Sequence, residues 1–228
     1  MREKGLNLRL MSAVGFVRQG AVFADIGTDH AYLPLFLLSE GRIERAVLAD
    51  INEGPLESAR RNAEATPYAD KVELCLTDGA AALQGKGITD YAICGMGGEL
   101  IADIIERAPH LRDESLNLIL QPMSRQSVLR RYLASRGFSI TAECYSEDSG
   151  KLYVCMQVKF VGEYREISDA EAEFGWKTTE IVNKNLQKEY IKQKKQSLTR
   201  AAYGKRLGGE DTSAEEALIA AAEELIRG

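Results

Sequence analysis

Acidic residues and a glycine follow the first apolar run of the chain, in the segment DIGTDH at residues 25–30. A glycine directly after a first strand lets a ligand approach the backbone closely. The dinucleotide fingerprint G-x-G-x-x-G is absent, because Asp29 and Ala31 stand at its later glycine positions. Asp25 and Asp29 would repel a pyrophosphate and attract a cation. If they are more than turn residues, they favour a cationic cofactor, and S-adenosylmethionine carries both a sulfonium and an ammonium.

Three further apolar runs end in residues that suit the same ligand. Asp50 lies 23 residues after Gly27, a spacing typical of an acid that accepts hydrogen bonds from ribose hydroxyls. Asp78 and Gly79 follow the next run, where a carboxylate can accept from an adenine amino group and a glycine N–H can reach a ring nitrogen. The run after that ends in CGMGG at residues 94–98, and its glycines permit very close backbone approach. Together these endings are more specific than any one of them.

The elements that must position these residues alternate along the first two thirds of the chain. We expect amphipathic helices at residues 32–40, 55–65, 100–107 and 124–136, and strands at residues 21–26, 45–51, 71–76, 90–94, 116–121, 138–145 and 153–160. Single helices between strands indicate a parallel sheet. Residues 146–150 are too few for a crossover, so the last two strands should form an antiparallel hairpin. The sequence predicts an α/β fold with a doubly wound, mostly parallel, seven-stranded sheet whose last strand is antiparallel.

The last quarter of the chain has a helical pattern. A capping box at Ser168 should begin a short helix, residues 183–207 should form a long polar helix, and a second capping box at Ser213 should begin a final amphipathic helix. We therefore predict two domains, residues 1–162 and a coiled-coil-like helical hairpin at 163–228. Residues 176–208 carry a net charge of +7, which leaves −12 on the remainder. This segment is either a solvated helix face or a binding surface for a polyanion.

Composition excludes several other classes of protein. The 228 residues are 45% hydrophobic and 28% charged, with a net charge of −5, as in soluble globular proteins. No apolar run approaches the roughly 18–20 residues that span a bilayer, and a signal-peptide core is missing, so we expect a cytoplasmic protein. The four cysteines lack C-x-x-C spacing and only two histidines are present, so we expect neither disulfides nor a metal site.

Four segments together resemble the bacterial tRNA (adenine(22)-N1)-methyltransferases. They are DIGTDHAYLP at residues 25–34, GMGG at 95–98, QP at 121–122 and EDSGKLY at 147–153. The resemblance covers the whole chain and implies a Rossmann-like methyltransferase domain followed by a helical tail. It also implies transfer of a methyl group from S-adenosylmethionine to N1 of adenine 22, in the D-loop region of tRNA. Base pairing hides N1, so the target adenine must be unstacked or flipped out.

The resemblance and the strand ends give each candidate residue a role. Asp29 is the candidate that stabilises positive charge on the methylated adenine, with Asn52 and Gln121 as weaker candidates. His30 is either a general base or a structural residue, and Tyr32 and Met96 offer surfaces for a flipped base. The expected cofactor-binding residues are Asp25, Gly27, Thr28, Asp50, Ile51, Asn52, Asp78, Gly79, Gly95, Met96 and Gly97. The expected tRNA-binding residues are Tyr32, Gln121, Pro122, Lys188, Lys192 and Lys195.

Two alternatives remain at the level of sequence. The chain could be an S-adenosylmethionine-dependent methyltransferase that acts on another RNA or on a small molecule, although a small-molecule enzyme needs no basic tail. It could also be a non-catalytic RNA-binding protein, although acids at three strand ends argue against that. The oligomeric state is open between a monomer and a weak dimer.

Overall fold

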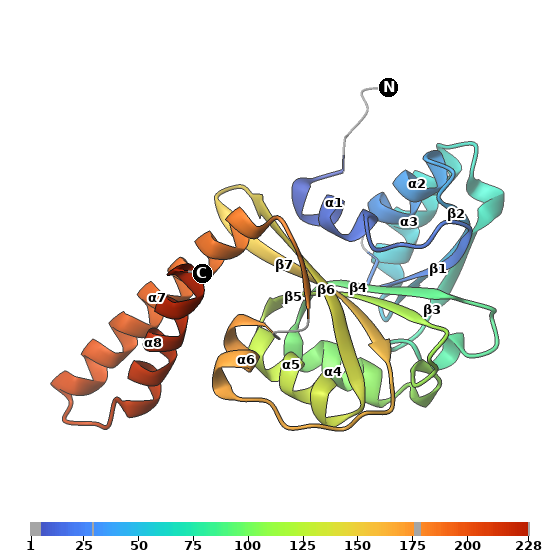
Figure 1. Ribbon diagram of the computed structural model, residues 1–228. Coiled ribbons are helices and arrows are strands. Elements are labelled where there is room, and N and C mark those ends of the chain that lie inside the picture. Colours follow the sequence, from blue (N-terminus) through green and yellow to red (C-terminus); the bar gives the residue numbers. More distant parts are fainter. Residues whose placement is uncertain (1–5, 29, 176–178, 228) are drawn as a thin grey trace.

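The computed structural model describes residues 6–28, 30–175 and 179–227, and it contains one mixed sheet flanked by helices (Figure 1). The strands are β1 (Ala21–Ile26), β2 (Ile43–Asp50), β3 (Val72–Leu76), β4 (Asp90–Gly97), β5 (Asn117–Ser124), β6 (Phe138–Asp148), β7 (Lys151–Phe160) and β8 (Glu180–Val182). Their order in the sheet is β3-β2-β1-β4-β5-β7-β6-β8. Strand β7 is antiparallel to both of its neighbours, β5 and β6, and the other pairings are parallel. This arrangement confirms the predicted doubly wound sheet and its antiparallel hairpin.

Helices cover both faces of the sheet, and each face has its own apolar core. The helices are α1 (Leu8–Val14), α2 (Tyr32–Ser39), α3 (Glu53–Glu64), α4 (Gly98–Glu106), α5 (Gln126–Ser135), α6 (Asp169–Phe174), α7 (Lys184–Leu207) and α8 (Ser213–Arg227). Short 3-10 turns lie at Ala69–Lys71, Ala81–Leu83 and Pro109–Leu111. One core holds residues of α1, α2 and α3, and the other holds residues of α4 and α5. Within the described residues, no helix is both long and apolar enough to cross a membrane.

Three features differ from the sequence-based expectations. The sheet has an eighth strand, because Glu180–Val182 pairs parallel to β6 at the edge of the sheet. Helix α1 was not predicted, and Asn7 caps it by accepting a hydrogen bond from the Leu10 N–H at 2.8 Å. The capping box at Ser168 is confirmed. The one at Ser213 is wrong, since Ser213 is already the first helical residue and Asp211 accepts from its N–H at 3.0 Å.

The tail extends from the body of the molecule as an antiparallel pair of helices, α7 and α8 (Figure 1). A small apolar cluster of Phe174, Ile191 and Ala222 joins α6, α7 and α8. The division into domains at residue 162 remains a prediction. The segments that follow residue 162 directly, α6 and β8, pack against α5 and β6 of the body.

A buried ion pair links α6 to this body. Arg130 on α5 and Glu143 on β6 are both fully buried, and the Arg130 Nε donates to a Glu143 oxygen at 3.0 Å. The same guanidinium donates to the carbonyls of Ala172 and Glu173, both in the last turn of α6. The Tyr145 hydroxyl donates to the other Glu143 oxygen at 2.7 Å. The network therefore holds α5, β6 and α6 at fixed positions.

Candidate functional site

A cavity of about 370 Å³ opens at the carboxyl ends of β1 and β4, beneath α1 and the start of α2. Doubly wound sheets bind ligands at this edge, where the strand order reverses. The reversal lies between β1 and β4 in this sheet. The cavity is lined by Asn7, Arg9, Leu10, Asp25, Gly27, Thr28, His30, Ala31, Tyr32, Leu33, Cys94 and Gly95. Six of the predicted site residues, from both ends of the first motif and from β4, therefore meet in one cavity.

Two glycines open the cavity to a ligand. Gly27 has a φ of +75° and Gly95 a φ of +87°, which side chains other than glycine rarely adopt. A Cβ atom on Gly27 would lie 2.0 Å from the terminal methyl of Met96, so the Met96 side chain packs directly over this glycine. Met96 thus lies beside the cavity. The backbone at both glycines is accessible only because neither has a side chain.

Asp25 places a carboxylate inside the cavity wall at the end of β1. It is 9% exposed, and burial raises its pKa from 3.8 to about 6. The Thr28 hydroxyl and the Arg9 guanidinium partly oppose that rise, whereas Asp50 adds to it. Burial likewise raises the pKa of the Cys94 thiol to about 12, so Cys94 is neutral. A carboxylate that burial destabilises in this way gains most from a bound cation.

Helix α1 supplies a residue that the sequence analysis did not identify. The Arg9 guanidinium lies in the cavity, and its Nη1 would be 3.7 Å from a Cβ on Gly95. Arg9 donates to the Gln121 side-chain oxygen at 2.5 Å, and the Gln121 amide donates back to the Arg9 carbonyl at 2.7 Å. Gln121, a predicted substrate ligand, is fully buried and fixes α1. The sequence signal that could have identified Arg9 is its position two residues after Asn7, a residue type that often caps the start of a helix.

The turn between β1 and α2 brings His30 and Tyr32 to the cavity. Ala31, between them, has a φ of 59°, a left-handed conformation that is uncommon outside glycine. The rings of His30 and Tyr32 lie 5.2 Å apart. The Asn62 side chain donates to the His30 carbonyl at 2.9 Å, which ties the turn to α3. Asp29, the predicted catalytic acid, lies outside the described residues.

The acids of β2 and β3 lie beyond the cavity, along the same edge of the sheet. Asp50 ends β2 and accepts from the Asn52 N–H at 2.8 Å, and its charge is near enough to raise the pKa of Asp25. Asp78 follows β3 and is ion-paired with Arg107, which lowers its pKa. An adenine amino group would share this carboxylate with Arg107. The other predicted cofactor ligands outside the cavity lining are Ile51, Asn52, Gly79, Met96 and Gly97.

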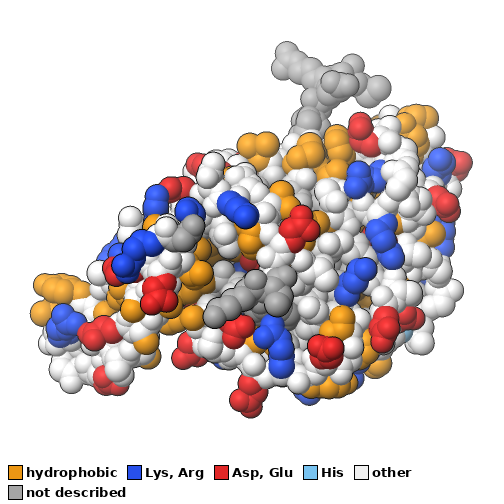
Figure 2. Space-filling view, in the orientation of Figure 1, with side chains coloured by type: hydrophobic (Ala, Val, Ile, Leu, Met, Phe, Trp, Pro, Cys, Tyr) orange, Lys and Arg blue, Asp and Glu red, His pale blue; other side chains and the backbone are white. Residues whose placement is uncertain are grey.

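The predicted tRNA-binding lysines lie on α7, far along the chain from the cavity. Two of them are ion-paired, Lys192 with Glu189 at 2.7 Å and Lys195 with Glu223 at 2.6 Å. Lys205 and Arg206 likewise pair with Glu215 and Glu216 of α8. Figure 2 accordingly shows basic and acidic side chains interspersed over this end of the molecule. Pro122 is buried, in the strand end beside Met96.

Comparisons with known proteins agree with this geometry. Residues 6–156 match the family model described as a methyltransferase domain. A Bacillus subtilis protein named tRNA (adenine(22)-N(1))-methyltransferase is 34% identical over 154 residues, which is 67% of this chain. That match spans 64% of the relative, so the chain aligns with slightly less than two thirds of its length.

Solved structures match over almost the whole chain. A Streptococcus pneumoniae protein, provisionally assigned as a tRNA (m1A22) methyltransferase, superposes with a TM-score of 0.84 at 31% identity, covering 97% of this chain and 100% of that one. The structure of the same protein in complex with S-adenosyl-L-methionine superposes with a TM-score of 0.82, at the same identity and coverage. The chain therefore belongs to the methyltransferase-domain family and, within it, to the family of bacterial tRNA (adenine(22)-N(1))-methyltransferases.

Proposed function

We propose that this protein transfers a methyl group from S-adenosylmethionine to N1 of adenine 22 in tRNA. The observation that carries the proposal is the cavity at the switch point of the sheet, which is lined by a buried carboxylate, Asp25, and a guanidinium, Arg9. The substrate comes from the relatives' names: the Bacillus subtilis protein is named a tRNA (adenine(22)-N(1))-methyltransferase, and the Streptococcus pneumoniae protein is provisionally assigned as one. Such a substrate would place the enzyme in the cytoplasm.

The cavity fits the charged end of the cofactor. An amino-acid group carries an ammonium and a carboxylate, which Asp25 and Arg9 complement in charge. Gly27 and Gly95 give the ligand access to the backbone. Asp50, at the end of the neighbouring strand, is the ribose ligand in this proposal, and Asp78 and Gly79 bind the adenine one strand further. The cofactor then lies across the ends of β4, β1, β2 and β3.

The chemistry requires alignment more than proton transfer. Bound S-adenosylmethionine supplies an electrophilic methyl group, and the N1 lone pair of adenine takes it while the carbon–sulfur bond breaks. Since N1 carries no proton, no base needs to act first, and the positive charge moves to the adenine. Asp29 is the group proposed to stabilise that charge. His30 and Tyr32 line the cavity mouth on the same turn, where Tyr32 offers a ring face to the flipped base.

The test is a methyl-transfer reaction with a tRNA transcript, followed by nuclease digestion and mass spectrometry of the nucleosides. We expect 1-methyladenosine from the native transcript and none from a transcript whose adenine 22 is replaced by guanine. An unmethylated native transcript would contradict the proposed function. Asp29→Ala should then lose turnover far more than cofactor affinity, whereas equal losses would place Asp29 among the cofactor ligands.

A further inference from the structure

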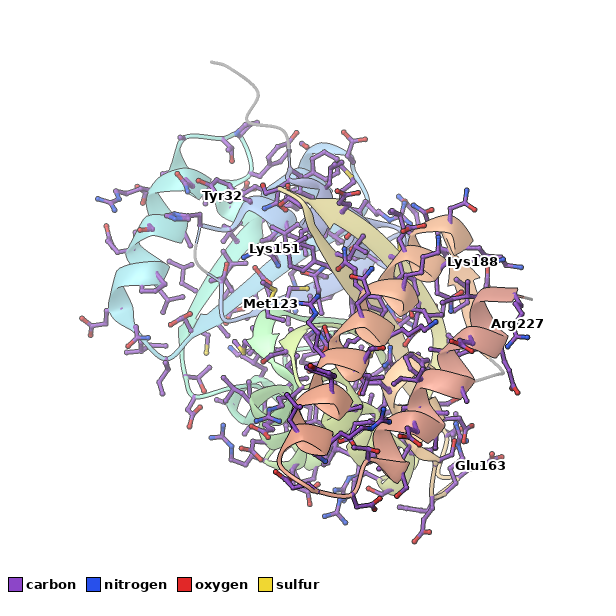
Figure 3. The ribbon with its side chains drawn as sticks, turned by 90° about the vertical axis from the view of Figure 1, so that its left-hand side faces the viewer. Tyr32, Met123, Lys151, Glu163, Lys188 and Arg227 are labelled. Atoms are coloured by element: carbon purple, nitrogen blue, oxygen red, sulfur yellow. The ribbon has the colours of Figure 1, made fainter. Side chains whose placement is uncertain are left out.

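A trough of about 530 Å³ separates α7 from the end of β5 and the start of β7. It lies on the flank of α7 that carries Tyr190, whose ring packs against Tyr145 of β6 at 5.3 Å. In Figure 3, Lys151 and Met123 lie between Tyr32 and α7. The trough is lined by Met123, Gln126, Leu152, Glu173, Tyr190, Gln193, Lys194, Ser197, Leu198 and Ala201. None of these residues lines the cofactor cavity.

The trough continues the sheet edge that holds the cofactor cavity. Strands β1, β4 and β5 are consecutive neighbours, and Met96 of β4 is paired with Pro122 of β5. Neighbouring strands lie about 4.8 Å apart, so the ends of β1 and β5 are separated by about 10 Å. Met123 therefore begins the trough about two strand spacings from Gly27. A single RNA strand with its target base in the cavity would need to span only about two strand spacings along this edge to reach the trough.

The lining suits bases and riboses better than phosphates. Its one ion pair, between Lys194 and Glu173 at 2.7 Å, neutralises both charges. The remaining polar groups are the amides of Gln126 and Gln193 and the hydroxyls of Tyr190 and Ser197, all of which can both donate and accept hydrogen bonds. Met123, 43% exposed, adds an apolar surface. Single-stranded RNA is recognised through such contacts to exposed base edges, stacking faces and 2′-hydroxyls.

An exposed cation with a strained backbone lies directly before the trough residue Gln126 in the chain. Arg125, directly before α5, has a φ of 57°. Its carbonyl lies so close to Gly98 that a Cβ there would approach it to 2.3 Å. Strained backbone of this kind is found at functional sites. The Arg125 side chain is 68% exposed and lies 3.8 Å from Glu99, a contact too long to hold it firmly. Arg125, next in the chain to the trough residue Gln126, can thus meet a phosphate.

We propose that this trough binds the unpaired nucleotides next to the target adenine and so selects the RNA that the enzyme methylates. The proposal rests on the proposed function. The wall of the trough is ordered before RNA binds, because Tyr190 packs against the buried Arg130–Glu143–Tyr145 network. A wall that is ordered before binding costs less conformational entropy when the RNA binds. An apolar segment of another protein is the competing occupant.

A matched pair of substitutions on α7 tests the trough. Ser197 and Thr199 are both exposed, and each hydroxyl donates to the carbonyl four residues earlier, at 3.2 and 2.9 Å. Ser197 lines the trough, whereas Thr199 lines a hollow on the other flank of α7. Ser197→Trp should lower kcat/KM for a tRNA transcript by about tenfold or more, which corresponds to about 1.4 kcal/mol. Thr199→Trp leaves the trough open and lines the same hollow as Lys192 and Lys195, so its loss should be smaller than that of Ser197→Trp by about threefold or more.

A second pair avoids any effect of bulk. Gln193→Ala removes an amide from the trough, and Gln196→Ala removes one from the opposite hollow. Loss of one or two neutral hydrogen bonds should cost Gln193→Ala about three- to tenfold in kcat/KM, and Gln196→Ala should lose less than Gln193→Ala. The affinity for S-adenosylmethionine, measured by calorimetry, should be native in all four variants.

The outcomes separate the trough from the proposed function. If native protein does not methylate the transcript, the proposed function fails. If native protein is active but both members of each pair lose activity equally, or the Thr199 and Gln196 variants lose more, the trough is not the RNA site. Unchanged activity in Ser197→Trp and Gln193→Ala would show that RNA does not occupy the trough. That result would overturn the proposal and favour a protein partner as the occupant. The assay contains only enzyme, cofactor and RNA, so a selective loss in the trough variants must arise from RNA.

Discussion

The buried carboxylate of Asp25 should link protein stability and cofactor affinity to pH. Burial raises the pKa of Asp25 from 3.8 to about 6, after partial compensation by Thr28 and Arg9 and a further increase from Asp50. A shift of about two pKa units corresponds to about 3 kcal/mol, at 1.36 kcal/mol per unit. The empty enzyme bears this cost at neutral pH to keep the carboxylate ionised.

The sign of the stability effect follows from proton binding. Between about pH 4 and pH 6 the folded protein holds a proton on Asp25 that the unfolded chain has lost. The free energy of unfolding should therefore fall as the pH rises through that range and then level off. Asp25→Asn removes this contribution, so the variant should be more stable than native protein at pH 7.5 by up to about 3 kcal/mol. Urea unfolding at several pH values measures both effects.

Cofactor affinity should change in the opposite direction. The ionised carboxylate attracts the ammonium of S-adenosylmethionine, so affinity should weaken by up to about tenfold per pH unit below pH 6. Asp25→Asn should weaken binding at pH 7.5 by about one to two decades, the value of a charged hydrogen bond, and should reduce the pH dependence. His30 lines the same cavity, so Asp25→Asn also shows whether the pH dependence of cofactor affinity comes from Asp25. Calorimetry showing native affinity in Asp25→Asn, or a flat profile between pH 5.5 and 7.5 in native protein, would refute this reasoning.

Three further substitutions test the ribose ligand, the buried ion pair and the tail. Asp50→Ala should weaken cofactor binding by about one to two decades in calorimetry, and an unchanged affinity would remove Asp50 from the cofactor site. Glu143→Gln leaves a buried guanidinium without its counter-charge and should cost about 3–5 kcal/mol in urea unfolding; a cost below about 1 kcal/mol would show that the pair is solvated. Charge reversal at Lys188, Lys192 and Lys195 of α7 should weaken tRNA binding. It should also flatten the slope of log affinity against log salt by about 0.7–0.9 for each lost phosphate contact. An unchanged slope in filter binding would show that these side chains do not contact phosphates.

The sheet could be predicted from the sequence because its strands are local, buried apolar runs bounded by turn residues. The first strand was predicted at its exact bounds, Ala21–Ile26, and the hairpin of β6 and β7 followed from a connection too short for a crossover. The eighth strand was not predictable in this way. Glu180–Val182 is three residues long, and only its pairing with β6 makes it a strand.

The candidate site could be predicted where it depends on strand ends, and not where it depends on tertiary contacts. Asp25, Gly27 and Gly95 follow strands whose carboxyl ends must meet at one edge. Arg9 reaches the same cavity only because Gln121, more than a hundred residues later, holds α1 over it. No local pattern in a seven-residue helix reports such a contact.

The charge of the tail shows the same limit. The sequence sum for residues 176–208 counts the bases of α7 but omits the acids of α8, which lie beyond that range. In the hairpin those acids pair with α7, through Glu215, Glu216 and Glu223. Much of the apparent positive charge is therefore neutralised within the tail. To bind a phosphate, each of these bases would have to give up its ion pair with α8. This favours an RNA-binding surface that also makes hydrogen bonds and apolar contacts.

The buried ion pair explains how such a surface can be held in place. Two opposite charges buried together often stabilise a fold no more than a well-packed apolar pair would, because desolvation offsets their attraction. Arg130 and Glu143 instead fix the relative positions of the elements around them, since their hydrogen bonds join two carbonyls at the end of α6 and the hydroxyl of Tyr145. The Tyr145 ring in turn supports Tyr190 of α7. A long helix attached through apolar contacts alone could rotate on the sheet edge, whereas one that packs against this network keeps its trough aligned with the end of β5.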